Sequence, residues 1–426
     1  MEREEKLMKS NKWKFLLTGA ATLTLLTACT QASSQSATTN NTAQTTATST
    51  SNSKTDSSNY FTDKDKDTSY DESTASTVKL SGSSATVSGD GVAVSGSTVT
   101  ISKAGTYVIS GESDGVQIKV EAGDSDDVHI VLKGVTMTNT NAPISATKAG
   151  HVYLTLAEGM TNTLSDSSSN NDEDADAVIF SKGDLTINGS GTLNIDAKKN
   201  NGIKANDTLH ITGGTYKITA VGDAFNVNDE LNITGTTMTI DADEDAVKVD
   251  NDEDTSVGTM YLSDNTMTIS AGDDGIHSSG DLIIDSGTYK VTESVEGLKG
   301  KSITLNGGDI TIYATDDGVN AANANANQDE IFFTMNGGTL NVEVGQGDTD
   351  PIDSNGNVTV TGGTINLTGQ SGFDFDGTAT YTGGDIYING EKQTEIVNSM
   401  PGGGGAPGGG GPQGGGPGGG PQGGGH

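Results

Sequence analysis

An acidic turn recurs through the middle of the chain, and its residue types could bind a metal ion. Each copy carries an acid or amide, then Gly or Ala, then a large apolar residue, as in Gly222–Phe225 and Asp273–Ile276. Starting from Ile203, the closing apolar residues are 22, 22, 29, 22 and 21 positions apart. A repeat of this length predicts that the turn occurs once in each coil of a solenoid.

Stacked coils would place these acidic side chains in a row. In a parallel β-helix, equivalent residues of neighbouring coils lie about 4.8 Å apart, and two carboxylates at that distance repel by roughly 3.5 kcal/mol at an effective dielectric near 20. Calcium, which takes roughly six to eight oxygen ligands, would relieve this repulsion. The alternative is that the acids only cap backbone N–H groups of turns. The predicted calcium ligands are Asp176, Asn201, Asp223, Asp243, Asp245, Asp273, Asp274, Glu296, Asp316 and Asp317.

A second set of polar residues directly follows the closing apolar residue of the turn. Lys204, Lys248 and Lys299 occupy this position, and His277 and Asn320 occupy it in other coils. If the position faces outward, these five residues are candidates for ligand binding, and the lysines could hold the carboxylates of an acidic sugar. The alternative is that the lysines are solvated or paired with the acids.

The three lysines are also weak candidates for a catalytic base. A polysaccharide lyase removes a proton beside a metal-neutralised carboxylate, which requires an Arg or a Lys with a lowered pKa, and the chain has no Arg after Arg3. Gly272–Gly275 resembles the paired aspartates of β-helical polygalacturonases, but the Gly-His-Gly and Arg-Ile-Lys motifs of those enzymes are absent. The sequence therefore identifies no catalytic residue beyond these weak candidates, and it favours a protein that binds a ligand without catalysis.

Short alternating strands connect the turns. Triplets such as Leu209–Ile211 and Tyr216–Ile218 alternate in polarity, as strands with one buried face do, and Gly-rich turns separate them. No 3.6-residue helical period is present, and a β-sandwich would have longer strands at irregular spacing. The sequence predicts an all-β solenoid, a parallel β-helix of about 21–23 residues per coil, over residues 77–398. Insertions at Asn251–Gly258 and Ala321–Asp329 are expected on one corner, beside a binding face.

The two ends of the chain differ from this region. Residues 1–28 have a basic start and a short apolar run, as in a secretion signal, and Leu26–Cys29 resembles a bacterial lipobox, which predicts lipidation of Cys29. The mature protein is then expected outside the cell, held to the membrane by this lipid only. Residues 29–76 are predicted to be a flexible tether, and residues 399–426 a disordered Gly/Pro-rich tail.

Composition restricts the partners. The formal net charge of −34 repels nucleic acid and bare anionic polymers and attracts cations. An acidic ligand must therefore be bridged by metal or met by local lysines. Cys29 is the one cysteine, so no disulfide is expected, and Trp13 is the one tryptophan, so no Trp platform for sugar stacking is expected in the mature chain. We expect a monomer.

Several motifs resemble a known family when they are read in order. Ala177–Gly191, Asn201–Lys204, Gly272–His277, Glu296–Gly300 and Thr315–Asn320 are similar to bacterial surface proteins of the carbohydrate-binding domain-containing family. The likeness covers roughly residues 79–396. It implies a right-handed parallel β-helix like that of pectate lyases, which binds calcium and plant-type polysaccharides, including acidic ones.

The last two coils depart from the family's turn. Asp350–Asp353 and Gly372–Asp374 replace it, so equivalent calcium ligands are not expected there. The leading hypothesis is calcium-dependent binding of a polysaccharide at the cell surface without catalysis. The alternatives are a polysaccharide lyase acting on uronate polymers with calcium and a Lys base, and a structural adhesin or matrix protein.

Overall fold

The computed structural model describes residues 57–251, 254, 256–347 and 349–399. The predicted signal peptide, the Cys29 lipidation site, most of the tether and the Gly/Pro-rich tail from residue 400 lie outside the described residues. Within the described part, the helical elements are two 3₁₀ turns, η1 (Ser57–Asn59) and η2 (Gln328–Glu330). Among the described residues, no helix is long and apolar enough to cross a bilayer.

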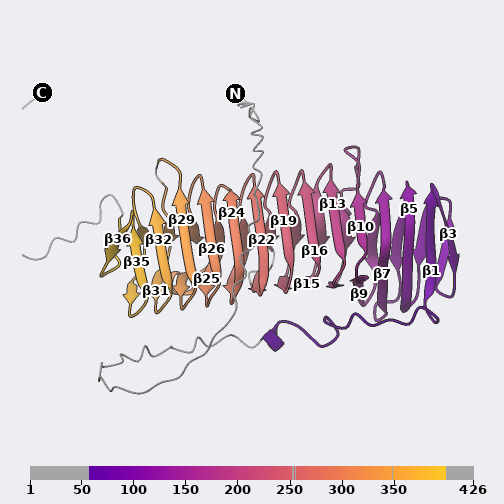
Figure 1. The fold of residues 1–426 in the computed structure, drawn as a ribbon, viewed down its shortest axis with the longest axis horizontal. Coiled ribbons are helices and arrows are strands. Elements are labelled where there is room, and N and C mark those ends of the chain that lie inside the picture. Colours follow the sequence, from indigo (N-terminus) through magenta and orange to yellow (C-terminus); the bar gives the residue numbers. More distant parts are fainter. Residues whose placement is uncertain (1–56, 252–253, 255, 348, 400–426) are drawn as a thin grey trace, which may run out of the picture. The chain divides into compact units, whose positions relative to one another are not determined.

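The described residues form a parallel β-helix whose coils carry three rows of strands, as predicted. We call these rows faces A, B and C. Face A comprises β9 (His151–Leu156), β12 (Leu185–Gly189), β15 (Thr208–Thr212), β18 (Glu230–Thr234), β21 (Thr259–Ser263), the second halves of β23 (Ile276–Ile284) and β25 (Leu298–Leu305), β28 (Phe332–Met335), β31 (Asn357–Val360) and β34 (Ala379–Tyr381). Face B comprises β10 (Thr161–Ser165), β13 (Thr192–Ala197), β16 (Thr215–Ala220), β19 (Thr237–Ala242), β22 (Asn265–Ala271), β24 (Gly287–Glu293), β26 (Asp309–Ala314), β29 (Thr339–Val344), β32 (Thr364–Thr368) and β35 (Asp385–Ile388). Figure 1 labels strands of face B, such as β16 and β24, and of face A, such as β15 and β31.

Face C has the shortest strands. It comprises β4 (Thr98–Ile101), β6 (Gln117–Glu121), β8 (Ile144–Lys148), β11 (Ala177–Ser181), β14 (Asn201–Ala205), β17 (Phe225–Val227), β20 (Val247–Val249), the first halves of β23 and β25, β27 (Val319–Ala321), β30 (Ile352–Ser354) and β33 (Phe373–Phe375). Longer strands β1 (Ser76–Gly82), β5 (Gly105–Asp114) and β7 (Asp127–Thr138) run parallel to one another in the first coils. Antiparallel strands β2 (Ser84–Ser88), β3 (Val92–Ser95) and β36 (Glu391–Gln393) complete the two ends.

The strand register confirms the coil length. Ile203 pairs with Phe225 and Phe225 with Val247, each 22 positions on, whereas Val247 pairs with Ile276, 29 positions on, across the first insertion. The right-handed sense of the coil stays a prediction.

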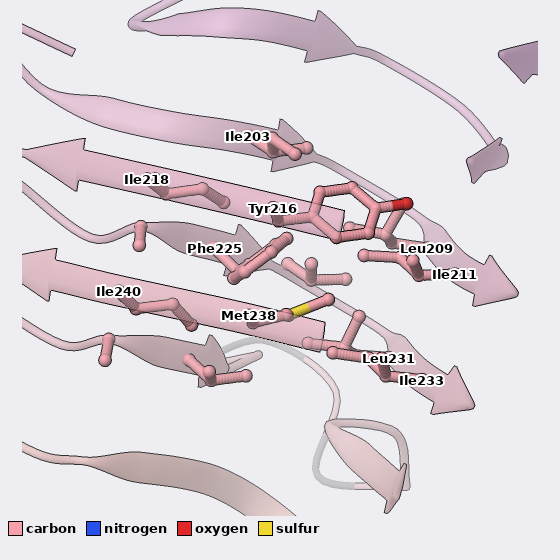
Figure 2. Close-up of a cluster of buried hydrophobic side chains, with 14 of the residues drawn as sticks. Ile203, Leu209, Ile211, Tyr216, Ile218, Phe225, Leu231, Ile233, Met238 and Ile240 are labelled. Atoms are coloured by element: carbon pink, nitrogen blue, oxygen red, sulfur yellow. The ribbon is translucent and has the colours of Figure 1, made fainter. Parts of the chain in front are cut away.

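Stacks of identical or similar apolar side chains hold this register. Figure 2 shows Ile218 beside Ile240 and Tyr216 beside Met238, from neighbouring coils of face B, and each pair is in register. All four side chains are buried, and full burial of such a side chain contributes roughly 1.5–3 kcal/mol. Because strand side chains alternate, a slip of one residue would turn every stack toward solvent.

Residues 57–75 correct the predicted tether. This segment, which we call the N-terminal strap, lies against face A, within the same compact unit as the coils. Phe61 and Asp65 are only 4% and 2% exposed. Asp65 accepts hydrogen bonds from the Thr62 N–H (2.8 Å) and the Thr186 hydroxyl (2.6 Å), and its carboxylate lies 3.2 Å from His210 Nδ1. The strap is therefore ordered because it satisfies polar groups of the coils.

Aromatic contacts add to this packing. The Tyr60 ring stacks on Tyr261 of β21 with centroids 3.7 Å apart, and Phe61 meets His210 edge to face. Residues 29–76 were predicted to be flexible because their composition is largely polar. That prediction did not take into account that Tyr60 and Phe61 can pack on the coils.

The two insertions lie on the same corner, between faces C and A, as predicted. Asn251 of the first insertion donates its N–H to the Ser279 hydroxyl, and Asn323 of the second donates its side-chain amide to the Ser279 carbonyl. Ser256 and Glu330 line one small hollow between them.

Candidate binding site along the carboxylate ladder

The acidic turns connect face B to face C, and their side chains stack as the sequence predicts. The Asn201 side-chain oxygen accepts the Asp223 N–H (3.0 Å), Asp223 accepts the Asp245 N–H (3.0 Å), and Asp245 accepts the Asp274 N–H (2.8 Å). Each side chain thus binds the backbone of its equivalent one coil on. We call this row the carboxylate ladder: Asp176, Asn201, Asp223, Asp245, Asp274, Glu296, Asp317 and Asp350.

Gly or Ala follows every ladder position except Asp350 and allows the coils to approach. A Cβ added at Gly297 would lie 2.4 Å from the Gly318 carbonyl oxygen, and one at Gly318 would lie 2.7 Å from the Pro351 carbonyl oxygen. Both distances are shorter than van der Waals contact, so glycine is required where the backbones come this close.

Three predicted calcium ligands lie outside the ladder. Asp243, Asp273 and Asp316 are exposed, whereas Asp245 and Asp274 are buried. The ladder residue is always the one two positions before the closing apolar residue. The sequence prediction included both acids of each pair because spacing alone did not show which one turns inward.

The second predicted set also lies in one row, on the outward side of face C. Register places Lys204, Lys248, His277, Lys299 and Asn320 side by side with one addition, Asn226, between the first two lysines. We call these six residues the outer stripe. The sequence analysis missed Asn226, although its position directly after Phe225 carried the same signal.

The lysines of the outer stripe pair with the ladder. Lys204 lies 2.7 Å from Asp176, Lys248 lies 2.9 Å from Asp245, and Lys299 lies 3.1 Å from both Asp274 and Glu296. This is the arrangement that the sequence analysis kept as an alternative to ligand binding.

These pairs raise the pKa of two lysines. Burial lowers the pKa of Lys248, but the interactions with Asp245, Asp223 and Asp250 together outweigh burial and raise it above its ordinary value. Asp274 and Glu296 together do the same for Lys299. A lysine general base needs a lowered pKa. The geometry therefore does not favour Lys248 or Lys299 as the base of a lyase.

Asp245, Asp274 and His277 form a cluster that could hold a metal ion, since their ligand atoms lie within 4.8 Å of one another. Burial raises the pKa of Asp245, but the contact with His277 and the charge of Lys248 outweigh it and lower the pKa to about 2. Burial and the charge of Glu296 raise the pKa of Asp274. Because two ammonium groups already balance this charge and calcium prefers oxygen to imidazole nitrogen, the cluster fits calcium poorly.

The far end of the ladder lacks lysine. Asp353 and Asp374 continue the row of the outer stripe after Asn320, and Asp317 and Asp350 are the last ladder residues. We call these four aspartates the acidic end. Burial, followed by the charges of Asp317 and Asp374, raises the pKa of Asp353 to about 7, and burial raises that of Asp317 to about 6.

The stacking of ladder side chains on backbone N–H groups continues to this end. Asp317 accepts the Asp350 N–H at 2.8 Å, just as the earlier rungs do. All four side chains offer carboxylate oxygens, the ligand type that calcium prefers, but among the described residues the group whose ligand atoms lie within 4.8 Å of one another is that of Asp245, Asp274 and His277.

Comparisons with known proteins identify relatives. A family model described as carbohydrate-binding domain-containing protein matches residues 95–349 and 272–400 of this chain. A carbohydrate-binding domain-containing protein of Acetivibrio thermocellus is 39% identical over 125 residues, which is 28% of this chain and 44% of the relative. The match thus spans less than half of that relative. A solved structure, the polysaccharide lyase-like protein from C. thermocellum as a gadolinium derivative, is 28% identical and covers 64% of this chain and 99% of its own, with a TM-score of 0.48.

Proposed function

Because this chain belongs to the carbohydrate-binding domain-containing protein family, we propose that it binds an acidic polysaccharide with the help of calcium and without catalysis. One observation carries this proposal: the charge on face C changes along the solenoid. In the earlier coils, lysines of the outer stripe pair with the ladder. At the acidic end, the same row carries Asp353 and Asp374 instead of lysines.

Calcium would be held at the acidic end. Asp317, Asp350, Asp353 and Asp374 would supply its carboxylate ligands. Burial raises the pKa of Asp353 most, and the charges of Asp317 and Asp374 add to it; a bound cation would relieve this repulsion. A bound calcium ion would also attract the carboxylate of a uronate.

The outer stripe would contact the polymer in the earlier coils. Its residues recur at about the 4.8 Å strand spacing along the solenoid axis, and the side chains of Lys248 and Lys299 are 28% and 32% exposed. The insertions at residues 251–258 and 321–329 lie on the neighbouring corner. A polysaccharide chain would therefore lie along the axis, between the ladder and the insertions.

The test is binding of polygalacturonate to the full chain with and without calcium, measured by calorimetry. We expect EDTA to weaken binding at least about tenfold and Asp353→Asn to reproduce that loss in the presence of calcium. Asp376→Asn is the matched control, because Asp376 is acidic, exposed and in the next coil. Binding that is unchanged by chelation would overturn the calcium dependence.

The same samples separate the two alternatives. An absorbance rise from new double bonds would establish a lyase and overturn the non-catalytic proposal. A folded protein that binds no acidic or neutral glycan on an array would favour the structural adhesin.

We also propose that Cys29 carries a lipid that anchors the protein outside the cell. The supporting observation is the lipobox-like Leu26–Cys29 at the end of an apolar run. Labelled palmitate should enter the wild-type protein and not Cys29→Ser, which should move from the membrane fraction to the medium. A variant that stays in the membrane fraction would contradict the anchor.

A further inference from the structure

A groove of about 500 Å³ crosses face B near the C-terminal end of the solenoid. Its floor lies along Val291, Ile312 and Val342 of β24, β26 and β29, and β32 closes its end. Neither the ladder nor the outer stripe contributes to it, because both lie on or beside face C.

Two rows of outward side chains form the walls. One row is Lys290, Thr311, Asn341 and Asn366, and these residues pair in register across four coils. The opposite row is Thr292, Tyr313, Glu343 and Thr368, in which Glu343 pairs with both Tyr313 and Thr368. The groove therefore runs along the solenoid axis, across the strands, for about 14 Å at the usual strand spacing.

Tyr313 supplies an exposed aromatic ring to this groove. Its side chain takes an outward position of β26 and is 40% exposed, whereas Tyr216 and Tyr289 on the same face are buried in the core. An exposed tyrosine offers a flat apolar face and a hydroxyl group in one side chain.

The opposite wall supplies oriented polar groups. The Asn366 amide donates to the Asn341 side-chain oxygen (2.8 Å), and the Asn341 amide donates to the Thr311 hydroxyl (3.4 Å). This chain of hydrogen bonds fixes the direction of both amides. Each amide nitrogen has a second N–H, so the row can still donate to the hydroxyl groups of a ligand.

The charge of the groove is balanced. Lys290 and Glu343 are its charged lining residues, while the whole chain has a net charge of −34. The negative charge of the chain would repel a polyanion. Within the groove, the one positive charge of Lys290 is balanced by the negative charge of Glu343. A neutral ligand with many hydroxyl groups meets neither obstacle.

We propose that this groove binds a neutral polysaccharide segment that lies along the solenoid axis. One sugar ring packs its apolar face on Tyr313, and its hydroxyl groups bond to Asn341 and Asn366. This site goes beyond the calcium-dependent site, because it lies on another face and its lining contains no carboxylate cluster for a metal. Binding here is therefore independent of calcium.

The test uses the full chain in EDTA against neutral oligosaccharides derived from xylan, mannan and mixed-linkage β-glucan. We expect at least one to bind, and we expect Tyr313→Ala to weaken that binding at least about tenfold. Tyr313→Phe keeps the ring and should retain most of the affinity. Thr219→Ala is the matched control, since Thr219 is an exposed outward residue of β16 on the same face, outside the groove.

The wall of amides gives a second, independent variant. Asn366→Ala removes a donor without touching the ring and should also weaken binding, whereas Lys217→Ala should not. Lys217 is the control because it lies in the same row of face B as Lys290 but outside the groove. The row runs from Lys217 through Thr239 and Thr268 to Lys290 in successive coils.

Three outcomes would overturn the proposal. The wild type could bind no neutral sugar, or Tyr313→Ala could leave the binding unchanged. The third outcome is that the wild type self-associates and Tyr313→Ala does not, which would make face B an interface between copies of this chain. Polygalacturonate binding with calcium is measured on the same variants and should not change. Binding of neutral oligosaccharides in EDTA thus tests this groove, and binding of polygalacturonate with calcium tests the calcium-dependent site, so the failure of one is distinguished from the failure of the other.

Discussion

At the residue scale, position within the acidic turn decides what a carboxylate does. Asp245 is buried and contacts the Asp274 N–H, Lys248 and His277. Asp243, two residues earlier, is exposed to solvent. The same residue type therefore serves structure at one position and solubility at the other.

This difference predicts unequal effects of removing the two acids. Asp245→Ala leaves a buried N–H and a half-buried lysine without their partner and should reduce the free energy of unfolding by about 2–4 kcal/mol. Asp243→Ala should change it by less than about 0.5 kcal/mol. Urea unfolding of both variants measures this, and equal effects would refute the assignment of Asp245 to the ladder.

The acidic end predicts an unusual dependence of stability on pH. The pKa of Asp353 is raised to about 7 in the folded protein from an ordinary value of 3.8. The folded state therefore binds this proton more tightly, so the contribution of Asp353 to stability is largest below about pH 4 and falls as pH rises from about 4 to 7. Melting temperatures in EDTA should show this fall, and Asp353→Asn should flatten it. Calcium should reverse it in the wild type, and a fall of equal size in the variant would contradict this role of Asp353.

At the element scale, the N-terminal strap is held by a charged group placed against face A. Burial lowers the pKa of His210, but Asp65 and Glu230 outweigh burial and raise it to about 9. Charged His210 therefore contributes stability that is fully present below about pH 6.5 and is lost as pH rises through about 9. The strap packs on His210 and Tyr261 of face A, and a hollow of about 310 Å³ remains beside His210.

Removal of this charge should release the strap. Asp65→Asn removes the nearer of the two carboxylates that face His210 and leaves Glu230 at 3.9 Å. Breaking a buried pair costs about 3–5 kcal/mol, so the strap should open more often. Trypsin should then cleave after Lys66 at least about tenfold faster than in the wild type. Asp71→Asn is the control, because Asp71 lies in the strap and is exposed, and a cleavage rate that does not change in Asp65→Asn would contradict this anchor.

At the scale of the whole molecule, stability is a sum over coils that contact mainly their neighbours. Thr288 of β24 pairs with Asp309 of β26, which is 21 positions on. One coil can therefore be removed without changing which side chains face the core.

This repeat predicts that a deletion of residues 288–308 still folds. The junction joins Gly287 to Asp309 in register, so circular dichroism should show the same β spectrum and a cooperative melt. A deletion one residue shorter, 288–307, shifts the alternation and turns apolar side chains outward, and it should melt earlier and less cooperatively. Equal melting of the two proteins would contradict the register argument.

The sequence by itself determined the repeat, the all-β fold, the coil length, the shared corner of the two insertions and the row of acids with a parallel row of lysines. These follow from local alternation and spacing, because an in-register stack forces equivalent residues to the same face in every coil. Only the tertiary structure decided which acid of each turn faces the ladder, that the ladder continues to Asp350, and that Tyr313 is exposed. It also decided that Asp65 meets Thr186, 121 residues away. Turn orientation and such distant contacts depend on where the backbone passes in space, which periodicity along the chain does not encode.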